Sequence, residues 1–252
     1  MPRKSRLNQI VSAVIDAGTL DVPTLAERFD VSEATIRRDL DLLEDQQLIS
    51  RTRGGATTNA AFNDLPLNYK TAQDLTEKRR IAERALDYLG DARVIGMTGG
   101  TTLTEFARGL VQHQSLTIVT NALNIATSLL ANPGLRVLVA GGEARSSSLE
   151  TIGPVAEAFL ADYNVDVAFL GVDGVDPVAG CTNYDPVGAR VNGVLQQRAR
   201  MTVVLADATK ISRVALAQVC SLSEIDVLIT DRRAPQEVLD QIRALGCEVV
   251  CV

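Results

Sequence analysis

The stretch VIGMTGGTTLTEFA, residues 94–107, predicts a buried strand, a glycine-rich turn and the first turns of a helix. Gly99 and Gly100 let the backbone approach a ligand closely, and the amides at the start of a helix attract an anion. Hydroxyl donors flank the turn at Thr98, Thr101 and Thr102. A phosphate would fit such a turn, but a plain tight turn would have the same sequence, so its meaning depends on the rest of the chain.

Apolar runs like this first one recur along the chain, and amphipathic helical segments separate most of them. Buried strands that alternate with helices predict an α/β domain with a mainly parallel sheet. The predicted strands cover residues 93–97, 116–120, 135–142, 165–172, 201–207, 226–231 and 247–252.

Polar residues follow five of these predicted strands. Ligands of parallel sheets gather beyond the carboxyl ends of the strands, so five polar strand ends at one edge predict a binding site, and Lys210 would neutralise a phosphate there. A single Gly-Gly pair is better explained as a tight turn. The candidates are Gly99, Gly100, Thr101, Thr102, Thr120, Asn121, Gly141, Gly142, Arg145, Asp173, Gly174 and Lys210.

The 252 residues suffice for one large domain or two ordinary ones, and 46% hydrophobic with 22% charged residues is an ordinary globular composition. No apolar run approaches the about 20 residues of a membrane span, and the N-terminus lacks the apolar core of a signal peptide. We therefore expect a cytoplasmic protein without a membrane partner. No metal site is expected, because no further Cys or His lies near Cys247 and Cys251 to complete one, and the four cysteines are interpreted as buried free thiols. No cofactor is expected either. The four cysteines are Cys181, Cys220, Cys247 and Cys251.

The first sixty residues predict three short helices and a β-hairpin. Apolar residues at helical spacing cover 5–17, 22–29 and 33–47, with a stop at Gly18 and an N-cap at Ser32. Residues 48–58 then alternate apolar and polar side chains around a Gly-Gly pair, as a hairpin would. This order describes a winged helix-turn-helix, whose third helix fits the major groove of DNA.

The net charge does not support DNA binding, but the positions of the Lys and Arg residues do. The chain carries a net charge of −6, and residues 1–58 hold eight Lys or Arg against nine Asp or Glu. Clustered cations still give a nearly neutral segment one basic face. Arg37 and Arg38 taken alone would be a solvated helix face, but the apolar stripe and the basic wing around them favour DNA contact.

The segment LAERFDVSEATIRRDLDLLEDQQLISRTRGGA, residues 25–56, resembles the DNA-binding signature of the DeoR family of bacterial transcriptional regulators. The shared pattern is V-S-x-x-T-I-R-R-D-L followed by a wing that ends in R-x-x-G-G-A. Asp39 is expected to pair with an arginine or an amide, because a carboxylate facing phosphates is costly. The resemblance implies contacts to double-stranded operator DNA from Ser32, Thr35, Arg37, Arg38, Arg51 and Arg53.

The remainder resembles the effector domain of the same family, which is similar in fold to ribose-5-phosphate isomerase. The matching segments are G-G-T-T, T-N-A-L-N-I-A, A-G-G, D-V-A-F-L-G-V-D-G and A-D-A-T-K. They imply a phosphorylated sugar as ligand, with the G-G-T-T turn and Lys210 at its phosphate. Asn192 stands where many members have a lysine, and Arg190 lies near it in sequence. We expect a winged helix-turn-helix domain over 1–58, a linker over 59–75 and the α/β sensor over 76–252.

A sugar-phosphate isomerase is the alternative, because D-G-V-D at residues 173–176 resembles an acidic element of that enzyme. Isomerisation needs a base and a cation that stabilises the enediolate. Residues 177–193 lack the lysine and the glycine run that would supply this cation, and the single histidine, His113, is expected to face solvent. A catalytically silent sensor is therefore favoured.

The resulting hypothesis is a homo-oligomer, a dimer or a tetramer, that represses a carbohydrate-catabolism operon and is released by a phosphorylated sugar. Activation in place of repression remains open. A third class, a pure protein-interaction module, predicts neither DNA retention nor stabilisation by any phosphosugar.

Overall fold

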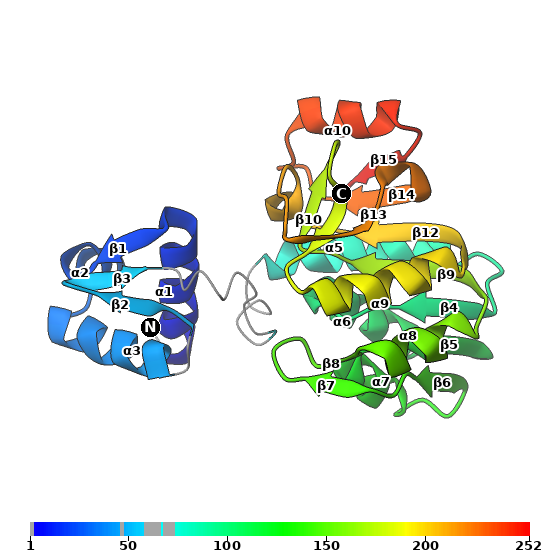
Figure 1. The fold of residues 1–252 in the computed structure, drawn as a ribbon, viewed down its shortest axis with the longest axis horizontal. Helices are drawn as coiled ribbons and strands as arrows, with labels where there is room; N and C mark the ends of the chain where they lie inside the picture. Colours follow the sequence, from blue (N-terminus) through cyan, green and yellow to red (C-terminus); the bar gives the residue numbers. More distant parts are fainter. Residues whose placement is uncertain (1–2, 46–47, 58–66, 68–73) are drawn as a thin grey trace. The chain divides into compact units, whose positions relative to one another are not determined.

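The computed structural model describes residues 3–45, 48–57, 67 and 74–252. The chain divides into two compact units, Met1–Leu65 and Pro66–Val252 (Figure 1). The linker expected over 59–75 falls largely outside the described residues. Of that range, only Leu67, Asp74 and Leu75 belong to them.

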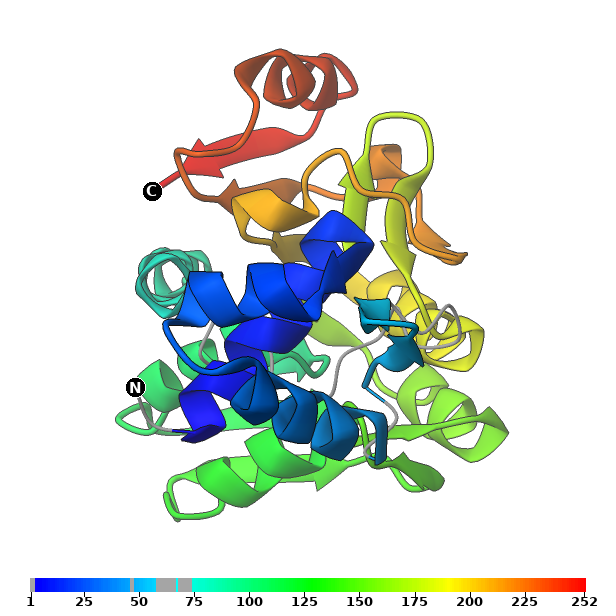
Figure 2. The same cartoon turned by 90° about the vertical axis from the view of Figure 1, so that its left-hand side faces the viewer.

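Within its described residues, the smaller unit packs three helices against a three-stranded antiparallel sheet of order β1-β3-β2 (Figure 2). The three helices and the hairpin are as the sequence predicts, whereas strand β1 was not expected. Gly55 lets β3 pair with β1, since a Cβ there would lie 2.1 Å from the carbonyl oxygen of Leu20. The elements are α1 (Arg3–Ala17), β1 (Thr19–Asp21), α2 (Val22–Phe29), α3 (Glu33–Asp45), β2 (Ser50–Thr52) and β3 (Gly55–Thr57).

The core of the smaller unit forms where the apolar stripes of its helices meet. Helix α1 ends before Gly18, which takes a φ of +74°. Helix α2 ends at Phe29, and the φ of 52° at its C-cap, Asp30, turns the chain toward α3, which begins three residues later at Glu33. The buried side chains include Ile10, Val14, Leu25, Ile36, Leu40, Leu43 and Ile49.

The described part of the larger unit holds a seven-stranded sheet of order β15-β14-β12-β9-β4-β5-β6, in which every neighbouring pair is parallel. These strands are the seven apolar runs that the sequence predicts. They are β4 (Val94–Met97), β5 (Leu116–Thr120), β6 (Leu135–Val139), β9 (Val165–Gly171), β12 (Ala199–Leu205), β14 (Val227–Thr230) and β15 (Glu248–Cys251).

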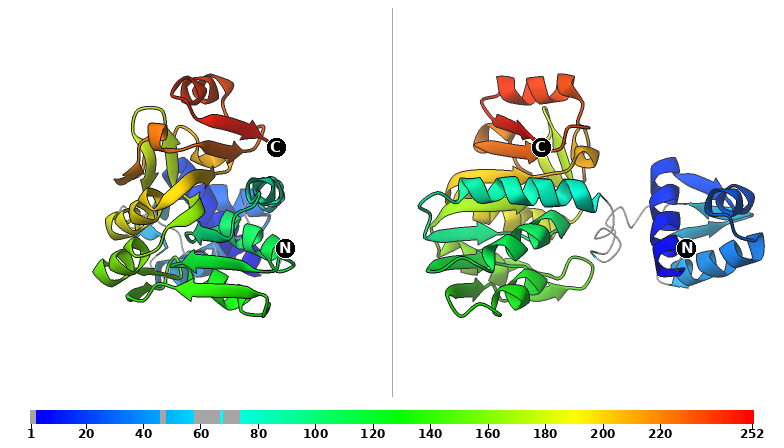
Figure 3. Two further views of the ribbon diagram at one scale, coloured as in Figure 1. Left: turned by 90° about the vertical axis from the view of Figure 1, so that its right-hand side faces the viewer. Right: turned by 180° about the vertical axis from the view of Figure 1, so that it is seen from behind.

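Helices cover both faces of this sheet (Figures 1 and 3). One core, built around Phe106 and Phe169, joins α5, α6 and α7 to one face. The other, around Leu160 and Leu195, joins α8, α9 and α10 to the opposite face. The helices are α5 (Leu75–Ala85), η1 (Leu86–Tyr88), α6 (Thr101–Leu110), α7 (Leu123–Leu129), α8 (Pro154–Ala161), α9 (Pro186–Gln197), η2 (Ala208–Lys210), η3 (Leu222–Glu224) and α10 (Gln236–Ala244).

Short antiparallel strands, which the sequence did not predict, follow the carboxyl ends of three strands. One hairpin pairs β7 with β8, and a small sheet has the order β10-β11-β13. Among the described residues, no helix is long and apolar enough to cross a membrane. The elements are β7 (Glu143–Arg145), β8 (Glu150–Ile152), β10 (Gly174–Asp176), β11 (Gly180–Asn183) and β13 (Ala217–Cys220).

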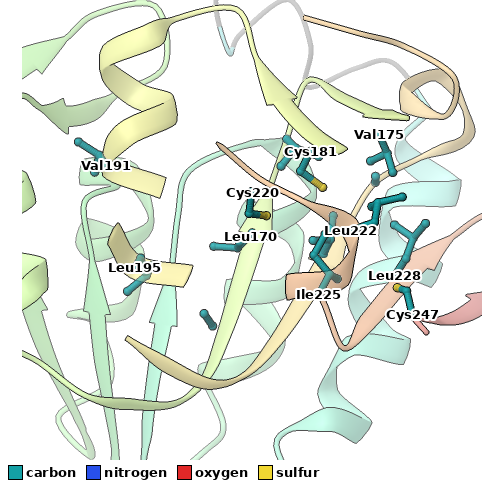
Figure 4. Packing of buried hydrophobic residues seen from close by; sticks show 14 of the residues in the cluster. Leu170, Val175, Cys181, Val191, Leu195, Cys220, Leu222, Ile225, Leu228 and Cys247 are labelled. Carbon is teal, nitrogen blue, oxygen red and sulfur yellow. The ribbon is translucent and has the colours of Figure 1, made fainter. Parts of the chain in front are cut away.

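The cysteines are free thiols, as expected. Cys181, Cys220 and Cys247 are buried in the core that also holds Leu170 and Leu222 (Figure 4), and Cys251 is half-buried. Within the described residues, no group of three or more His, Cys, Asp or Glu side chains is placed to hold a metal ion.

Candidate functional site

The start of helix α3 presents two hydroxyls side by side. The Oγ of exposed Ser32 lies 2.9 Å from the Oγ1 of Thr35 and accepts the Thr35 backbone N–H at 3.3 Å. Ser32 therefore acts as the N-cap that its sequence position predicts. Both side chains lie at the N-terminal end of α3, and in helix-turn-helix proteins this end of the recognition helix contacts base edges.

The two arginines of α3 differ in their surroundings. Arg37 pairs with Glu33 one turn earlier at 2.6 Å, with both side chains about half exposed. Arg38 is exposed, and no hydrogen bond or ion pair joins its side chain to another residue in the described part of the chain. The Arg38 guanidinium is consequently available to a partner without the loss of an ion pair.

The arginines of the wing also have different roles. The Arg51 backbone N–H donates to Oε1 of Glu44 at 2.9 Å, and its guanidinium lies 3.5 Å from Oδ1 of Asp41. Arg51 thus fastens strand β2 to helix α3, and only 25% of its side chain is exposed. Arg53 is exposed beside Gly54, whose φ of +104° forms the turn of the wing.

Asp39 is a structural residue, which confirms the sequence-based expectation. Its side chain is 1% exposed and accepts the Nε–H of Arg3 at 3.0 Å and that of Arg6 at 2.7 Å. Two cations of the basic N-terminus are thereby engaged inside the unit, and helix α1 is joined to helix α3.

In the larger unit, the five polar strand ends belong to five adjacent strands, in the order β12-β9-β4-β5-β6. The chain runs outward from β4 to β5 and β6 on one side and from β9 to β12 on the other. The strand order therefore reverses between β4 and β9, and ligands of open α/β sheets bind at such a point. A Cβ at Gly171 would lie 2.6 Å from the carbonyl oxygen of Gly99, so the glycine-rich turn crosses the end of β9 closely.

The glycine-rich turn already holds an anionic group of the protein itself. Gly100 has a φ of +121° and precedes helix α6, in which Thr101 is half-buried and Thr102 is buried. The backbone N–H of Gly99 donates to Oε1 of Glu150 at 2.8 Å. Sequence reasoning missed Glu150, because it stands on the short strand β8 and not at the end of a predicted strand.

The charge of Glu150 is disfavoured where it lies. Burial raises the pKa of the Glu150 carboxyl, and the neighbouring Asp173 carboxylate raises it further. The Gly99 N–H and the Arg145 guanidinium lower this pKa, but they act against the larger effect of desolvation.

Two buried asparagines beside this point have unsatisfied oxygens. Asn121 is fully buried, and its Nδ2–H donates to the Thr151 carbonyl at 3.2 Å. Asn192 is 3% exposed, and its Nδ2–H donates to the Gly171 carbonyl at 3.5 Å. Neither Oδ1 atom has a hydrogen-bond partner among the described residues, and buried acceptors are seldom left so.

Other candidates have contacts that explain them without a ligand. The Thr120 Oγ1 accepts the Ala122 N–H at 3.0 Å. A Cβ at Gly142, where φ is +129°, would lie 2.7 Å from the Ile152 carbonyl oxygen, while Gly141 before it is exposed. Gly174 is buried within β10.

The charged candidates are spread along the edge. Arg145 on β7 lies 3.7 Å from Oδ2 of Asp185 at the start of α9. The Asp173 Oδ2 accepts the Tyr184 N–H at 3.3 Å. Lys210 is the last residue of η2, which follows β12. Strand β12 lies two strands away from β4 in the sheet, about 10 Å at the usual strand spacing.

The two acidic residues of the isomerase-like element have different surroundings: Asp173 lies near Glu150, whereas Asp176 is engaged in a turn. Asp176 lies at the β10–β11 turn, where its Oδ1 accepts the backbone N–H groups of Val178 and Ala179, both at 2.9 Å. His113 is exposed, as expected. Arg190 forms an ion pair with Glu157 at 3.3 Å, so its guanidinium is engaged away from the position of Asn192 on the same helix.

A winged-helix unit with exposed arginines on α3 and on the wing, joined in one chain to an α/β unit with polar strand ends at one edge, is typical of ligand-responsive DNA-binding regulators. Family models support both units. Residues 6–62 match the DeoR-like helix-turn-helix domain, and residues 73–232 match the DeoR C-terminal sensor domain. The chain therefore belongs to the DeoR family of transcriptional regulators.

Two repressors are similar in sequence to this chain along nearly its whole length. The HTH-type transcriptional repressor CsqR of Escherichia coli K12 is 31% identical over 97% of this chain and 94% of its own. The glycerol-3-phosphate regulon repressor of the same strain is 32% identical over 95% of each chain. Ribose 5-phosphate isomerase A from Neisseria gonorrhoeae is 17% identical, with a TM-score of 0.40 over 56% of this chain and 55% of its own. The family and these two repressors are transcriptional regulators, not enzymes.

Proposed function

We propose that this protein represses a carbohydrate-catabolism operon and that a phosphorylated sugar, bound in the larger unit, releases it. The names of relatives support this proposal, since they include a glycerol-3-phosphate regulon repressor and a putative aga operon transcriptional repressor, each 32% identical. Activation is the second candidate, because a relative from Haemophilus influenzae, 29% identical, is named an L-fucose operon activator.

The exposed face of α3 and the tip of the wing carry the DNA half of the proposal. Ser32, Thr35 and Arg38 meet the major groove, and Arg53 meets a phosphate beside it. Arg37 and Arg51 contribute charge to the same surface while their ion pairs hold α3 and the wing in place. The observation that carries this assignment is the exposed Arg38, which has no ion pair within the described residues.

The edge around the β4–β9 reversal carries the effector half. The amides of the turn from Gly99 to Thr102, together with Lys210, bind the phosphate. Asn121 and Asn192 accept hydrogen bonds from sugar hydroxyls through oxygens that have no partner among the described residues. Asn192 is neutral, so the sugar substituent that it contacts is a hydroxyl and not a second anionic group.

Regulation requires the two units to respond together. We infer a cytoplasmic homo-oligomer, a dimer or tetramer, that places two or more winged helices on repeated half-sites of operator DNA. The sugar phosphate binds more tightly to the state with low operator affinity, and this differential affinity shifts the population away from DNA.

Gel-shift titration with a labelled fragment from upstream of the protein's own gene tests the DNA assignment. Arg37→Ala with Arg38→Ala should weaken binding at least tenfold, because each contact to a base is worth about 1–3 kcal/mol. Arg200→Ala is the matched control, since Arg200 is exposed in the larger unit. Undiminished binding by the double variant would refute the role of α3.

A further inference from the structure

The amide that is expected to meet the effector's anionic group is occupied in this structure. Oε1 of Glu150 accepts the Gly99 N–H at 2.8 Å and the Asn121 Nδ2–H at 3.4 Å. A Cβ built on Gly99 would lie 2.6 Å from the Glu150 carboxyl carbon. The Glu150 side chain therefore fills the space beside the glycine-rich turn, where an incoming ligand has to lie.

A carboxylate and a phosphate cannot share this place. Both carry negative charge and both need the Gly99 N–H, so one has to leave when the other binds. The charged groups that face Glu150 are Arg145 on β7 and Asp173 after β9. Burial and Asp173 raise the pKa of Glu150, so the fold already disfavours its ionised form, which eases its replacement.

The β7–β8 hairpin connects Glu150 to Leu67. Glu150 on β8 lies opposite Arg145 on β7 in the register of the hairpin. At the tip between them, the carbonyl oxygen of Ser147 accepts the Leu67 N–H at 2.7 Å. Leu67 is the next described residue after Thr57 in the chain, so a shift of the hairpin acts directly on Leu67 through this hydrogen bond.

We propose that Glu150 is a built-in occupant of the Gly99 anion position, that an anionic group of the effector replaces it there, and that the β7–β8 hairpin passes this replacement to Leu67. The proposal rests on the proposed function, in which a phosphate binds at the glycine-rich turn. It adds the residue that competes with the ligand and the element that responds to it.

Inorganic phosphate is the first probe, titrated at pH 7.5 and constant ionic strength by calorimetry. Glu150→Gln keeps an acceptor for Gly99 but removes the charge, and Glu150→Ala removes both. Both variants should bind phosphate at least tenfold more tightly than the unmodified protein. Glu143→Gln, an exposed acid on the same hairpin, should bind as the unmodified protein does. Equal phosphate affinity in all four proteins would overturn the competition.

Hydrogen exchange of the Leu67 amide tests the hairpin. This amide should be protected in the unmodified protein and should exchange at least fivefold faster with saturating phosphate. Gly99→Ala should give fast exchange without phosphate, because its methyl group displaces the Glu150 carboxyl. Gly99 does not have a left-handed φ, so the backbone tolerates alanine there. Unprotected Leu67 in the unmodified protein, or protection that is unchanged by phosphate and by Gly99→Ala, would overturn the coupling.

The outcomes separate this inference from the regulator proposal. Circular dichroism and operator gel shift on each protein establish that it is folded and binds DNA. If the variants retain operator DNA but phosphate affinity and Leu67 exchange do not change, the inference on Glu150 fails alone. If the unmodified protein retains no operator DNA, the proposed function fails whatever the phosphate titration shows.

Discussion

At the scale of single residues, Glu150 makes the stability of the protein depend on pH in a direction that can be worked out. Its pKa is raised in the folded state, chiefly by burial. A raised carboxyl pKa stabilises the fold fully below the ordinary value of about 4.3, and this contribution is lost as the pH rises through the folded value. Charge at Glu150 therefore opposes folding at neutral pH.

Glu150→Gln should accordingly melt at a higher temperature than the unmodified protein at pH 7–8. Its amide oxygen still accepts the Gly99 N–H, and the charge is gone. The difference in melting temperature should shrink toward zero as the pH falls to about 4. Scanning calorimetry from pH 4 to pH 8 measures it, with Glu143→Gln as control. An advantage of the unmodified protein that grows with pH would contradict the assignment.

At the scale of elements, helix α1 depends on helix α3 through one buried carboxylate. Asp39 receives Arg3 and Arg6, and the Arg6 side chain is only 11% exposed. Removal of one partner from a buried ion pair leaves the other charge without compensation. The position of α1 on α3 is thus set by charge as well as by the apolar core.

Asp39→Ala should lower the free energy of unfolding of the smaller unit by about 3 kcal/mol. Asp41→Ala on the same helix is the matched control, since Asp41 is 64% exposed and lies 3.5 Å from Arg51. An exposed pair of this kind contributes only about 0–1 kcal/mol. Urea titration followed by circular dichroism compares the two variants, and equal losses would show that burial of Asp39 has no special weight.

At the scale of the whole molecule, the two compact units have separate cores, Met1–Leu65 around α1 to α3 and Pro66–Val252 around the parallel sheet. A ligand that binds only one folded unit stabilises that unit by mass action. Each unit should therefore respond to its own ligand.

We expect two unfolding transitions in a calorimetric scan of the full chain. A phosphorylated sugar that binds the larger unit should raise only one of them, by an amount that corresponds to about 2.7 kcal/mol when the ligand is at 100 times its dissociation constant. Operator DNA should raise the other. A single transition that both ligands shift would mean that the two units unfold as one.

Most of the architecture could be predicted because it depends on the spacing of apolar and polar residues that are close in the sequence. Strands buried on both faces are near-continuous apolar runs, so all seven strands of the parallel sheet were found. The winged-helix unit follows from the apolar stripe of α3, the N-cap Ser32 and the glycines of the wing. The short strands β1, β7, β8, β10, β11 and β13 were not predicted, since none of them contains a continuous apolar run or a clear alternation of apolar and polar residues.

The sequence by itself determined the two units, the parallel sheet and the polar strand ends, because each depends on residues that are close neighbours in the chain. Only the tertiary structure decided what those residues meet. The tertiary structure brings Glu150 to the Gly99 amide, although the two residues are 51 positions apart in the sequence. Helix packing brings Arg3 to Asp39, which are 36 positions apart. Such contacts depend on how distant elements pack, which local spacing does not encode. The fold could therefore be predicted from the sequence, whereas the position of Glu150 at the Gly99 N–H could not.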